Sequence, residues 1–196
     1  RRTASHFYAC SRQSGVWLFG GSRSHLVRVL HNGVDLQHFE YNPSSRNDIR
    51  AELGLHESDI ALGHVGRFDA NKNQGFLLRL MAELAARGVA RKLVLVGTGP
   101  CLADVTADAS RLDVSGSVLF LGFRTDVSRM LAALDGFLLP SLYEGMPVSL
   151  VEAQASGLPC FVSDSIDPGV AIIPEDVTFL PLHDTESWVE RLSVFT

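Results

Sequence analysis

From residue 60 onward, short and wholly apolar runs alternate with longer segments in which apolar residues recur every three or four positions. The short runs predict six β-strands, at residues 60–65, 93–96, 118–121, 136–139, 159–163 and 177–180. The longer segments predict helices at residues 73–87, 102–112, 126–134, 147–156 and 186–192. Strands that are apolar throughout are typical of a parallel sheet covered on both faces by helices. The pattern therefore predicts an α/β fold with a doubly wound, Rossmann-like parallel sheet.

The segment before residue 60 is less regular. In chain order it predicts a strand-like patch at 7–10, a short helix capped by Ser11 and ending at Gly20 and Gly21, a strand at 27–30, a tight turn at Asn32 and Gly33, a local cap at Asp35, a linker at 41–45 and a helix at 46–53. The regular alternation begins only after these elements.

Composition narrows the class of protein. The 196 residues are 46% apolar and 20% charged, as in an ordinary globular domain, and the net charge of -5 argues against a nucleic-acid partner. The three cysteines have no metal-like spacing and are expected to be reduced core thiols, which favours a cytoplasmic protein. No apolar run approaches the roughly 20 residues that span a bilayer, and no signal peptide is evident. The seven histidines form no i,i+4 pair, so no metal site is expected; His31 and His64 border apparent pocket loops but are expected to be turn or core residues.

The loops that follow the strands should line the carboxyl edge of the sheet, where ligands of such folds bind. The first of these loops, residues 66–73, carries Arg67 and Lys72. A planar guanidinium and a compact ammonium together suit a diphosphate, although two ordinary surface cations are the simpler alternative. We expect the phosphate role because a helix N-terminus, another anion site, follows on the same edge.

Two further loops are candidates for the same pocket. Gly97 and Gly99 form an incomplete G-x-G-x-x-G fingerprint on the wrong strand, so a dinucleotide cofactor is not favoured; the glycines are expected to allow a flat ring or a backbone to approach closely. Phe123 either borders a nucleobase or serves only in packing. Thr125 is expected to cap the helix that follows.

The segment from Pro140 to Glu152 carries the clearest chemistry. Pro147 suits the first helical position, and the amides that follow have no intrahelical acceptor and form an anion site: Val148, Ser149 and Leu150. Glu144 precedes this helix and Glu152 lies inside it among apolar residues. A carboxylate that accepts two neighbouring hydroxyls is the ordinary way to hold a ribose or a hexose. The alternative is a capping role for Glu144 and a surface role for Glu152.

Together these stretches resemble the donor-binding, carboxy-terminal domain of retaining glycosyltransferases of the GT-B fold, in the group-one family, and exopolysaccharide and capsule enzymes in particular. The matching stretches are Asn32 to Asp35 with Phe39, Gly66 to Phe68 with Lys72 and Asn73, Val96 to Pro100, Leu121 to Phe123 with Asp126 and Val127, and Pro140 to Glu152 with Ala155, Gly157 and Pro159. Residues 1–26 resemble the end of the preceding acceptor domain with its linker, and residues 27–196 resemble the donor domain. Gln74 departs from the histidine that often follows Lys-Asn in the family.

The resemblance implies roles for individual residues. Arg67 and Lys72 would hold the donor diphosphate and, with Glu144, form the catalytic set. Glu144 would contact the transferred sugar, helped by the amides of Gly145 and Met146. Glu152 would hold the ribose hydroxyls.

The implied function is transfer of a hexose from a nucleotide sugar, with UDP favoured over GDP, to a saccharide or lipid-linked acceptor with retained configuration and without metal or cofactor. Most of the acceptor domain is absent, so the isolated chain is expected to bind donor without transferring sugar. The resemblance also allows peripheral association of the whole enzyme with the inner face of the cell membrane. A non-catalytic nucleotide-binding or interaction module and a nucleotide-sugar epimerase of similar fold are the alternatives.

Overall fold

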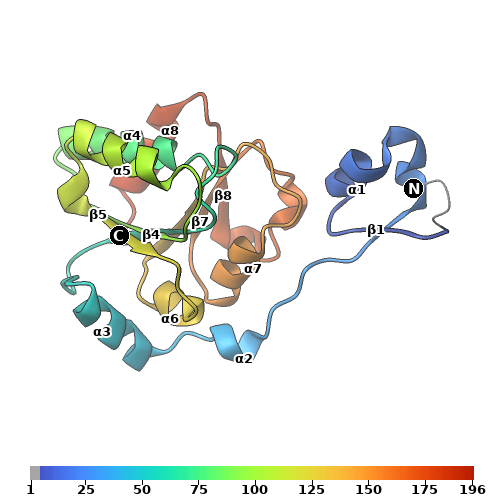
Figure 1. The fold of residues 1–196 in the computed structure, drawn as a ribbon. Helices are drawn as coiled ribbons and strands as arrows, with labels where there is room; N and C mark the ends of the chain where they lie inside the picture. Colours follow the sequence, from blue (N-terminus) through green and yellow to red (C-terminus); the bar gives the residue numbers. More distant parts are fainter. Residues whose placement is uncertain (1–4) are drawn as a thin grey trace.

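A computed structural model describes residues 5–196 as a small N-terminal unit joined to a larger α/β unit (Figure 1). The N-terminal unit contains β1 (Phe7–Ala9), α1 (Arg12–Phe19), the 3-10 helix η1 (Gly21–Leu26) and β2 (Val27–Val29), and β1 pairs with β2 in parallel. Ser11 caps α1 as predicted, because its hydroxyl accepts a hydrogen bond of 3.1 Å from the Ser14 amide.

The strand predicted at 27–30 therefore belongs to the small sheet. The predicted domain boundary between residues 26 and 27 would instead assign this strand to the larger unit. The Leu30 amide still donates to the Ala9 carbonyl at 2.9 Å, and the Asn32 side chain already donates to the Met146 carbonyl at 2.7 Å. The chain thus passes from one unit to the other at His31. The division into acceptor and donor domains stays a prediction.

Two helices follow the crossing and pack against the larger unit: α2 (Leu36–Phe39), capped by Asp35 as predicted, and α3 (Pro43–Glu52). The prediction of a linker at 41–45 and a helix from residue 46 is wrong, because α3 begins at Pro43. Asn42 caps it by accepting from the Ser45 amide at 3.1 Å. Proline is well suited to the first helical turn, where its missing N–H has no partner to lose.

The larger unit is built on six parallel strands, and the prediction of a doubly wound sheet is confirmed. They are β3 (Ala61–Val65), β4 (Lys92–Val96), β5 (Val118–Gly122), β6 (Gly136–Leu139), β7 (Cys160–Ser163) and β8 (Val177–Leu180), in the order β5-β4-β3-β6-β7-β8. The strand order reverses between β3 and β6. In doubly wound sheets the ligand crevice opens at the carboxyl ends of the strands at such a reversal.

Helices cover both faces of this sheet (Figure 1). They are α4 (Gln74–Ala86), α5 (Leu102–Arg111), α6 (Val127–Ala132), α7 (Val148–Ala155) and α8 (Thr185–Ser193), with short 3-10 turns η2 (Ser115–Ser117), η3 (Pro168–Val170) and η4 (Pro174–Asp176). One buried cluster includes residues of α3, α6 and α7, and the other includes residues of α4, α5 and α8. No helix within residues 5–196 is long and apolar enough to cross a bilayer.

Two predicted helix starts need correction. Asp126, not Thr125, occupies the N-cap position of α6, and its carboxylate is held by the Arg124 guanidinium at 2.9 and 2.8 Å instead of capping the helix. Pro147 is the N-cap of α7 and not its first helical residue, because its ψ of 117° is extended.

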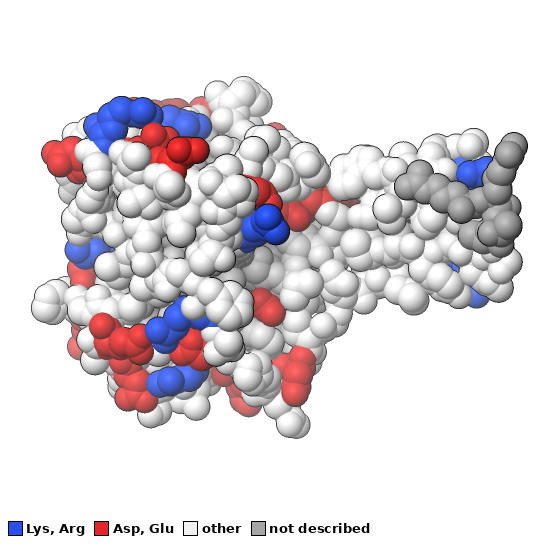
Figure 2. Space-filling view, in the orientation of Figure 1, with Lys and Arg blue, Asp and Glu red and all other residues white. Residues whose placement is uncertain are grey.

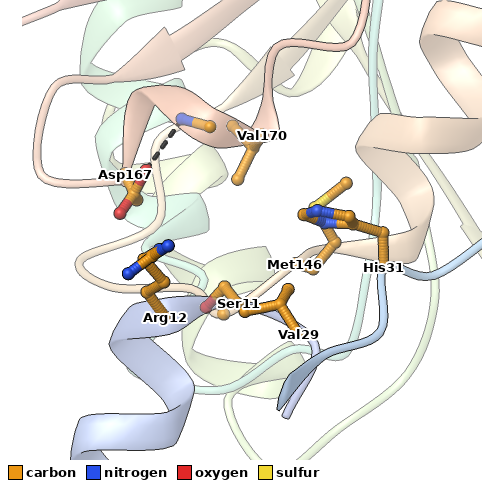
Figure 3. Close-up of a pocket in the computed structure, with 9 residues that line it drawn as sticks. Ser11, Arg12, Val29, His31, Met146, Asp167 and Val170 are labelled. Atoms are coloured by element: carbon orange, nitrogen blue, oxygen red, sulfur yellow. Dashed lines mark hydrogen bonds between the residues drawn. The ribbon is translucent and has the colours of Figure 1, made fainter. Parts of the chain in front are cut away.

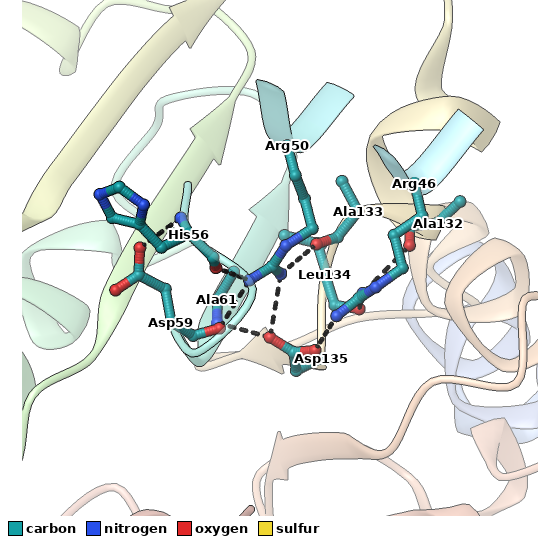
Figure 4. A network of polar contacts seen from close by, with 9 residues as sticks. All are labelled: Arg46, Arg50, His56, Asp59, Ala61, Ala132, Ala133, Leu134 and Asp135. Carbon is teal, nitrogen blue, oxygen red and sulfur yellow. Dashed lines mark hydrogen bonds and ion pairs between the residues drawn. The ribbon is translucent and has the colours of Figure 1, made fainter. Parts of the chain in front are cut away.

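A partly buried polar network holds α3 against the amino ends of β3 and β6 (Figure 4). Arg50, which is 5% exposed, donates to the Ala133 carbonyl at 3.0 Å and to the Asp135 carboxylate at 3.3 Å. Asp135 also accepts from Arg46 at 2.6 Å and from the Ala61 amide at 2.7 Å. These bonds satisfy the buried charges and lie at the sheet edge opposite the predicted site.

Candidate functional site

Lys72 and Glu144 meet at the carboxyl edge of the sheet. The Lys72 Nζ lies 2.6 Å from the Glu144 Oε1, and the two side chains are only 17% and 13% exposed. Lys72 follows a turn in which its own amide donates to the Asp69 Oδ1 at 3.1 Å, while Arg67 is exposed at the start of the same loop. Of the three residues predicted as the catalytic set, Lys72 and Glu144 form a direct ion pair that the sequence did not reveal, and Arg67 lies in the same loop as Lys72.

Gly97 and Gly99 lie against the loop that follows β3. A Cβ on Gly97, whose φ is +136°, would lie 1.9 Å from the Gly66 carbonyl oxygen, and one on Gly99 would lie 2.2 Å from the Phe68 carbonyl oxygen. The predicted close approach of a backbone is confirmed, because only a residue without a side chain fits at either position. Approach of a flat ring stays a prediction.

These glycines line a pocket of about 540 Å³ together with Arg67 and residues that follow β5. Phe123 stands at the pocket with 74% of its surface exposed, so it is not a packing residue of the core. Arg124, next to it, is fixed by Asp126 and by Glu52 at 2.8 Å. The pocket offers an exposed aromatic face and glycine backbone, which suits a flat heterocycle.

Helix α7 begins at the same carboxyl edge of the sheet, after the loop that follows β6. The Leu150 amide donates to the Pro147 carbonyl at 3.1 Å, so the prediction that this amide lacks an intramolecular acceptor is wrong. Val148 and Ser149, the two residues before it, carry the first amides of the helix; the Val148 side chain is 45% exposed. The anion site predicted here therefore consists of the Val148 and Ser149 amides, without that of Leu150.

Glu152 lies one turn further along α7 and is half-buried. Burial raises the pKa of its carboxyl group, and the positive charge of His38 on α2 opposes this shift. A partly desolvated carboxylate gains when hydroxyl groups donate to it. Glu152 is thus suited to hold a polyhydroxyl group at the surface between α2 and α7.

His64 is a core residue, as predicted. Its Nδ1 lies 2.9 Å from the Leu138 carbonyl, and burial lowers its pKa from 6.5 to about 4, so the imidazole is neutral. Its neighbour Gln74 donates to the Arg67 carbonyl at 2.9 Å. The glutamine that departs from the family pattern therefore supports the loop that carries Arg67.

A second pocket, of about 300 Å³, lies between the two units (Figure 3) and was not predicted. Its lining combines Ser11, Arg12, Val29 and His31 with Gly145, Met146, Asp167, Gly169 and Val170. Helix α1 packs directly against the loop that carries Glu144, because a Cβ on Gly145 would lie only 2.1 Å from the Ser14 hydroxyl. A signal was present in the sequence: residues 164–170 follow a predicted strand and so belong to the same sheet edge.

The described residues 5–196 contain no group of three His, Cys, Asp or Glu side chains placed to hold a metal ion. Cys10, Cys101 and Cys160 are free, and burial raises the pKa of Cys160. In Figure 2, residues of both charge signs lie interspersed on the visible face of the larger unit, and the described part of the chain shows no continuous basic patch on that face.

A family model described as Glycosyl transferases group 1 matches residues 59–195, which is more than half of the chain. The chain therefore belongs to the group 1 glycosyl transferases. It is 41% identical over 197 residues to EpsF of Bacillus subtilis (strain 168), whose name places it among glycosyltransferases; the match covers 97% of this chain and 50% of EpsF.

A second relative is the UDP-Gal:alpha-D-GlcNAc-diphosphoundecaprenol alpha-1,3-galactosyltransferase of Escherichia coli. It is 33% identical over 176 residues, which cover 85% of this chain and 44% of that protein. The chain thus spans about half the length of the curated relatives it matches.

Solved structures show the same architecture. Anabaena Alr3699/HepE, in a crystal structure with UDP and glucose, superposes with a TM-score of 0.85 at 23% identity, over 97% of this chain and 53% of HepE. WaaG, a glycosyltransferase involved in lipopolysaccharide biosynthesis, gives 0.80 at 23% identity, over 96% of this chain and 53% of WaaG. At such identities the likeness shows the fold, and the predicted carboxy-terminal half of a GT-B fold is confirmed.

Proposed function

We propose that this chain is the nucleotide-sugar-binding part of a retaining glycosyltransferase that transfers a hexose from a UDP-sugar to a saccharide or lipid-linked acceptor. One observation carries the proposal. Lys72 and Glu144 form an ion pair between the loops that follow β3 and β6, the strands between which the order reverses, and Arg67 lies in the same loop as Lys72. A cationic pair, a helix N-terminus and a carboxylate at this place suit a diphosphate bonded to a sugar.

The donor would lie across the pockets already described. Its base occupies the pocket of Gly97, Gly99 and Phe123, and its ribose hydroxyls donate to Glu152. The diphosphate is held by Arg67 and Lys72 and by the first amides of α7. The hexose then reaches Glu144 and the amides of Gly145 and Met146.

The protein's part in the reaction is electrostatic. As the bond between the anomeric carbon and the phosphate oxygen breaks, negative charge grows on the diphosphate, and the two cations with the positive end of α7 stabilise it. The proposal therefore requires no metal ion or cofactor. Glu144 holds a sugar hydroxyl while the acceptor oxygen bonds to the anomeric carbon and gives its proton to the departing diphosphate oxygen.

The UDP preference is supported by HepE, whose structures hold UDP and glucose or UDP-glucose, and by the Escherichia coli relative, whose name includes UDP-Gal. The name of that relative also includes a diphosphoundecaprenol acceptor, which supports a lipid-linked acceptor and peripheral association of the whole, otherwise cytoplasmic enzyme with the membrane. The acceptor would approach through the pocket between α1 and Gly145. Because this chain spans half of its relatives, it is expected to bind donor without transferring sugar.

Thermal unfolding in the presence of nucleotides tests the proposal. At a concentration of about 100 Kd, UDP should stabilise the chain by about 2.7 kcal/mol. For a chain of this length that corresponds to an increase in Tm of about 5–10 °C. GDP and ADP should stabilise it less, and Lys72→Ala and Glu152→Ala should each reduce the shift.

The chain offers matched controls. Lys92 lies at the amino end of β4 and Glu190 is exposed on α8, so Lys92→Ala and Glu190→Ala should keep the full UDP shift. Absence of a shift with any nucleoside diphosphate would sink the donor site and favour an interaction module. Release of a free epimerised sugar by the whole protein without acceptor would favour an epimerase.

A further inference from the structure

The loop that carries Glu144 is fastened to the loop of Lys72 by the residue that precedes the lysine. The Asn71 Nδ2 donates to the Tyr143 carbonyl at 2.8 Å, and the Tyr143 amide donates to the Asn71 Oδ1 at 3.2 Å. The Leu142 amide donates to the Asn71 backbone carbonyl at 2.8 Å. One asparagine thus holds the peptide groups on both sides of Tyr143, directly before Glu144.

The residue after the lysine holds the other end of the same loop. Asn73 adopts the left-handed conformation, with φ of 54° and ψ of 38°, which asparagine tolerates better than most residues. Its Nδ2 donates to the Pro140 carbonyl at 3.1 Å. Asn71 and Asn73 therefore bracket Lys72, whose ammonium pairs with Glu144 between them.

The two side chains that directly precede Glu144 are exposed. Leu142 and Tyr143 are 47% and 55% exposed, so neither side chain anchors the backbone in the core. Tyr143 meets the Trp17 ring edge-on at 5.5 Å between centroids, and Trp17 is itself 50% exposed. The peptide groups on both sides of Tyr143 are therefore held by their hydrogen bonds to Asn71 and not by burial of the Leu142 or Tyr143 side chain.

We propose that Asn71 is a positioning residue for Glu144, which it holds against Lys72 and at the position of the transferred hexose. This inference rests on the proposed function. Asn71 acts through the backbone of Tyr143 and leaves the phosphate-binding groups in place, because Lys72 is fixed separately by its amide bond to Asp69. Loss of Asn71 should therefore impair sugar positioning and leave nucleotide binding intact.

The amide group of Asn71 is needed for both of its side-chain bonds. Asn71→Ala removes both, whereas Asn71→Asp still accepts from the Tyr143 amide but cannot donate to the Tyr143 carbonyl. Both variants lose the hydrogen bond to the Tyr143 carbonyl, but only Asn71→Asp keeps an acceptor for the Tyr143 amide. This difference separates the positioning role from a general loss of stability.

Hydrogen exchange of this chain gives the first test and needs no ligand. In Asn71→Ala the Tyr143 amide should exchange about tenfold faster or more, because its acceptor is gone, while Asn71→Asp keeps most of the protection. Asn42→Ala is the matched control: it removes a side-chain bond to the Ser45 amide at the start of α3 and should leave Tyr143 unchanged. Equal protection of Tyr143 in wild type and Asn71→Ala would overturn the proposal.

Steady-state kinetics of the whole enzyme give the second test. Both Asn71 variants should lose about tenfold to hundredfold in kcat, because Glu144 is misplaced in the transition state. Neither the donor KM nor the Kd for UDP should rise by more than about threefold. A kcat equal to that of wild type, or an equal loss in UDP affinity and kcat, would refute the positioning role. Failure of the wild-type enzyme to bind UDP would instead refute the proposed function, and the exchange experiment then decides on Asn71 alone.

Discussion

Replacing Glu144 by glutamine should make the chain bind UDP more tightly. In the structure the Lys72 ammonium donates to the Glu144 carboxylate at 2.6 Å, and both side chains are largely buried. If the diphosphate takes the same ammonium, it must compete with this carboxylate. Glu144→Gln keeps the shape of the side chain and removes the competing charge, so it leaves Lys72 free for the nucleotide.

The size of the gain follows from the geometry. Two unit charges 2.6 Å apart attract by about 6 kcal/mol at an effective dielectric constant of 20. Desolvation and side-chain ordering cancel most of this, to about 0–1 kcal/mol for exposed pairs, whereas breaking a fully buried pair costs about 3–5 kcal/mol. With exposures of 17% and 13%, this pair lies between the two limits. A net value of about 1.5 kcal/mol makes UDP bind about tenfold more tightly.

Titration calorimetry of four chains isolates the effect: wild type, Glu144→Gln, Lys72→Met and the double variant. In the Lys72→Met background Glu144→Gln should change the Kd for UDP by about threefold or less, since only screened repulsion of the phosphates is removed. UDP-hexose should gain less than UDP, because its sugar loses the contact with Glu144. An unchanged or weaker affinity of Glu144→Gln for UDP, or the same gain without Lys72, would refute the competition.

Three further predictions concern pH and stability. Because burial raises the pKa of Glu152, this carboxyl group contributes to stability below its ordinary pKa of 4.5, and the contribution is lost as the pH rises. Glu152→Gln should therefore be more stable than wild type at about pH 7 and equally stable in acid. Urea unfolding of both proteins at the two pH values measures the difference. Burial lowers the pKa of His64 from 6.5 to about 4, so its neutral imidazole stabilises the fold above pH 6.5. The free energy of unfolding of wild type should fall by about 3 kcal/mol between pH 6.5 and about pH 4, and that of His64→Gln should not. Parallel pH profiles of the two proteins would contradict the neutral core imidazole. Arg50→Met should cost about 1–3 kcal/mol in urea unfolding because the Ala133, His56 and Asp59 carbonyls lose their donor, and the Kd for UDP should stay at the wild-type value. Asp135 keeps its bonds to Arg46 and to the Ala61 amide.

The sheet could be predicted because its four central strands, β4, β3, β6 and β7, are buried on both faces. Residues 136–139 and 160–163 are buried at every position, and a short, uninterrupted apolar run reports that environment directly. The observed strand limits lie within one residue of the predicted ones for the same reason. The small sheet was different: β2 is only half-buried, and nothing in its three residues indicated that its partner is β1.

The candidate site could be predicted only as a set of loops on one edge. Topology places the ends of β3 and β6 side by side, but it does not determine which side chains touch. Lys72 and Glu144 are 72 positions apart, and their ion pair depends on turn geometry that periodicity does not report. Asn71 was invisible for a similar reason, since asparagine in a loop is typical of any turn. Hydrogen bonds between loops have no sequence period.

Gly145 has a consequence for protein engineering. Its missing side chain leaves room for the Ser14 hydroxyl of α1, which would lie 2.1 Å from any Cβ at this position, and the Cys10 sulfur would lie 3.1 Å from it. A chimera that grafts residues 31–196 onto another N-terminal half would therefore succeed or fail at this contact. A chimera that transfers the larger unit together with β1, α1 and β2 would keep the contact between Ser14 and Gly145. The junction of such a chimera therefore belongs before residue 7.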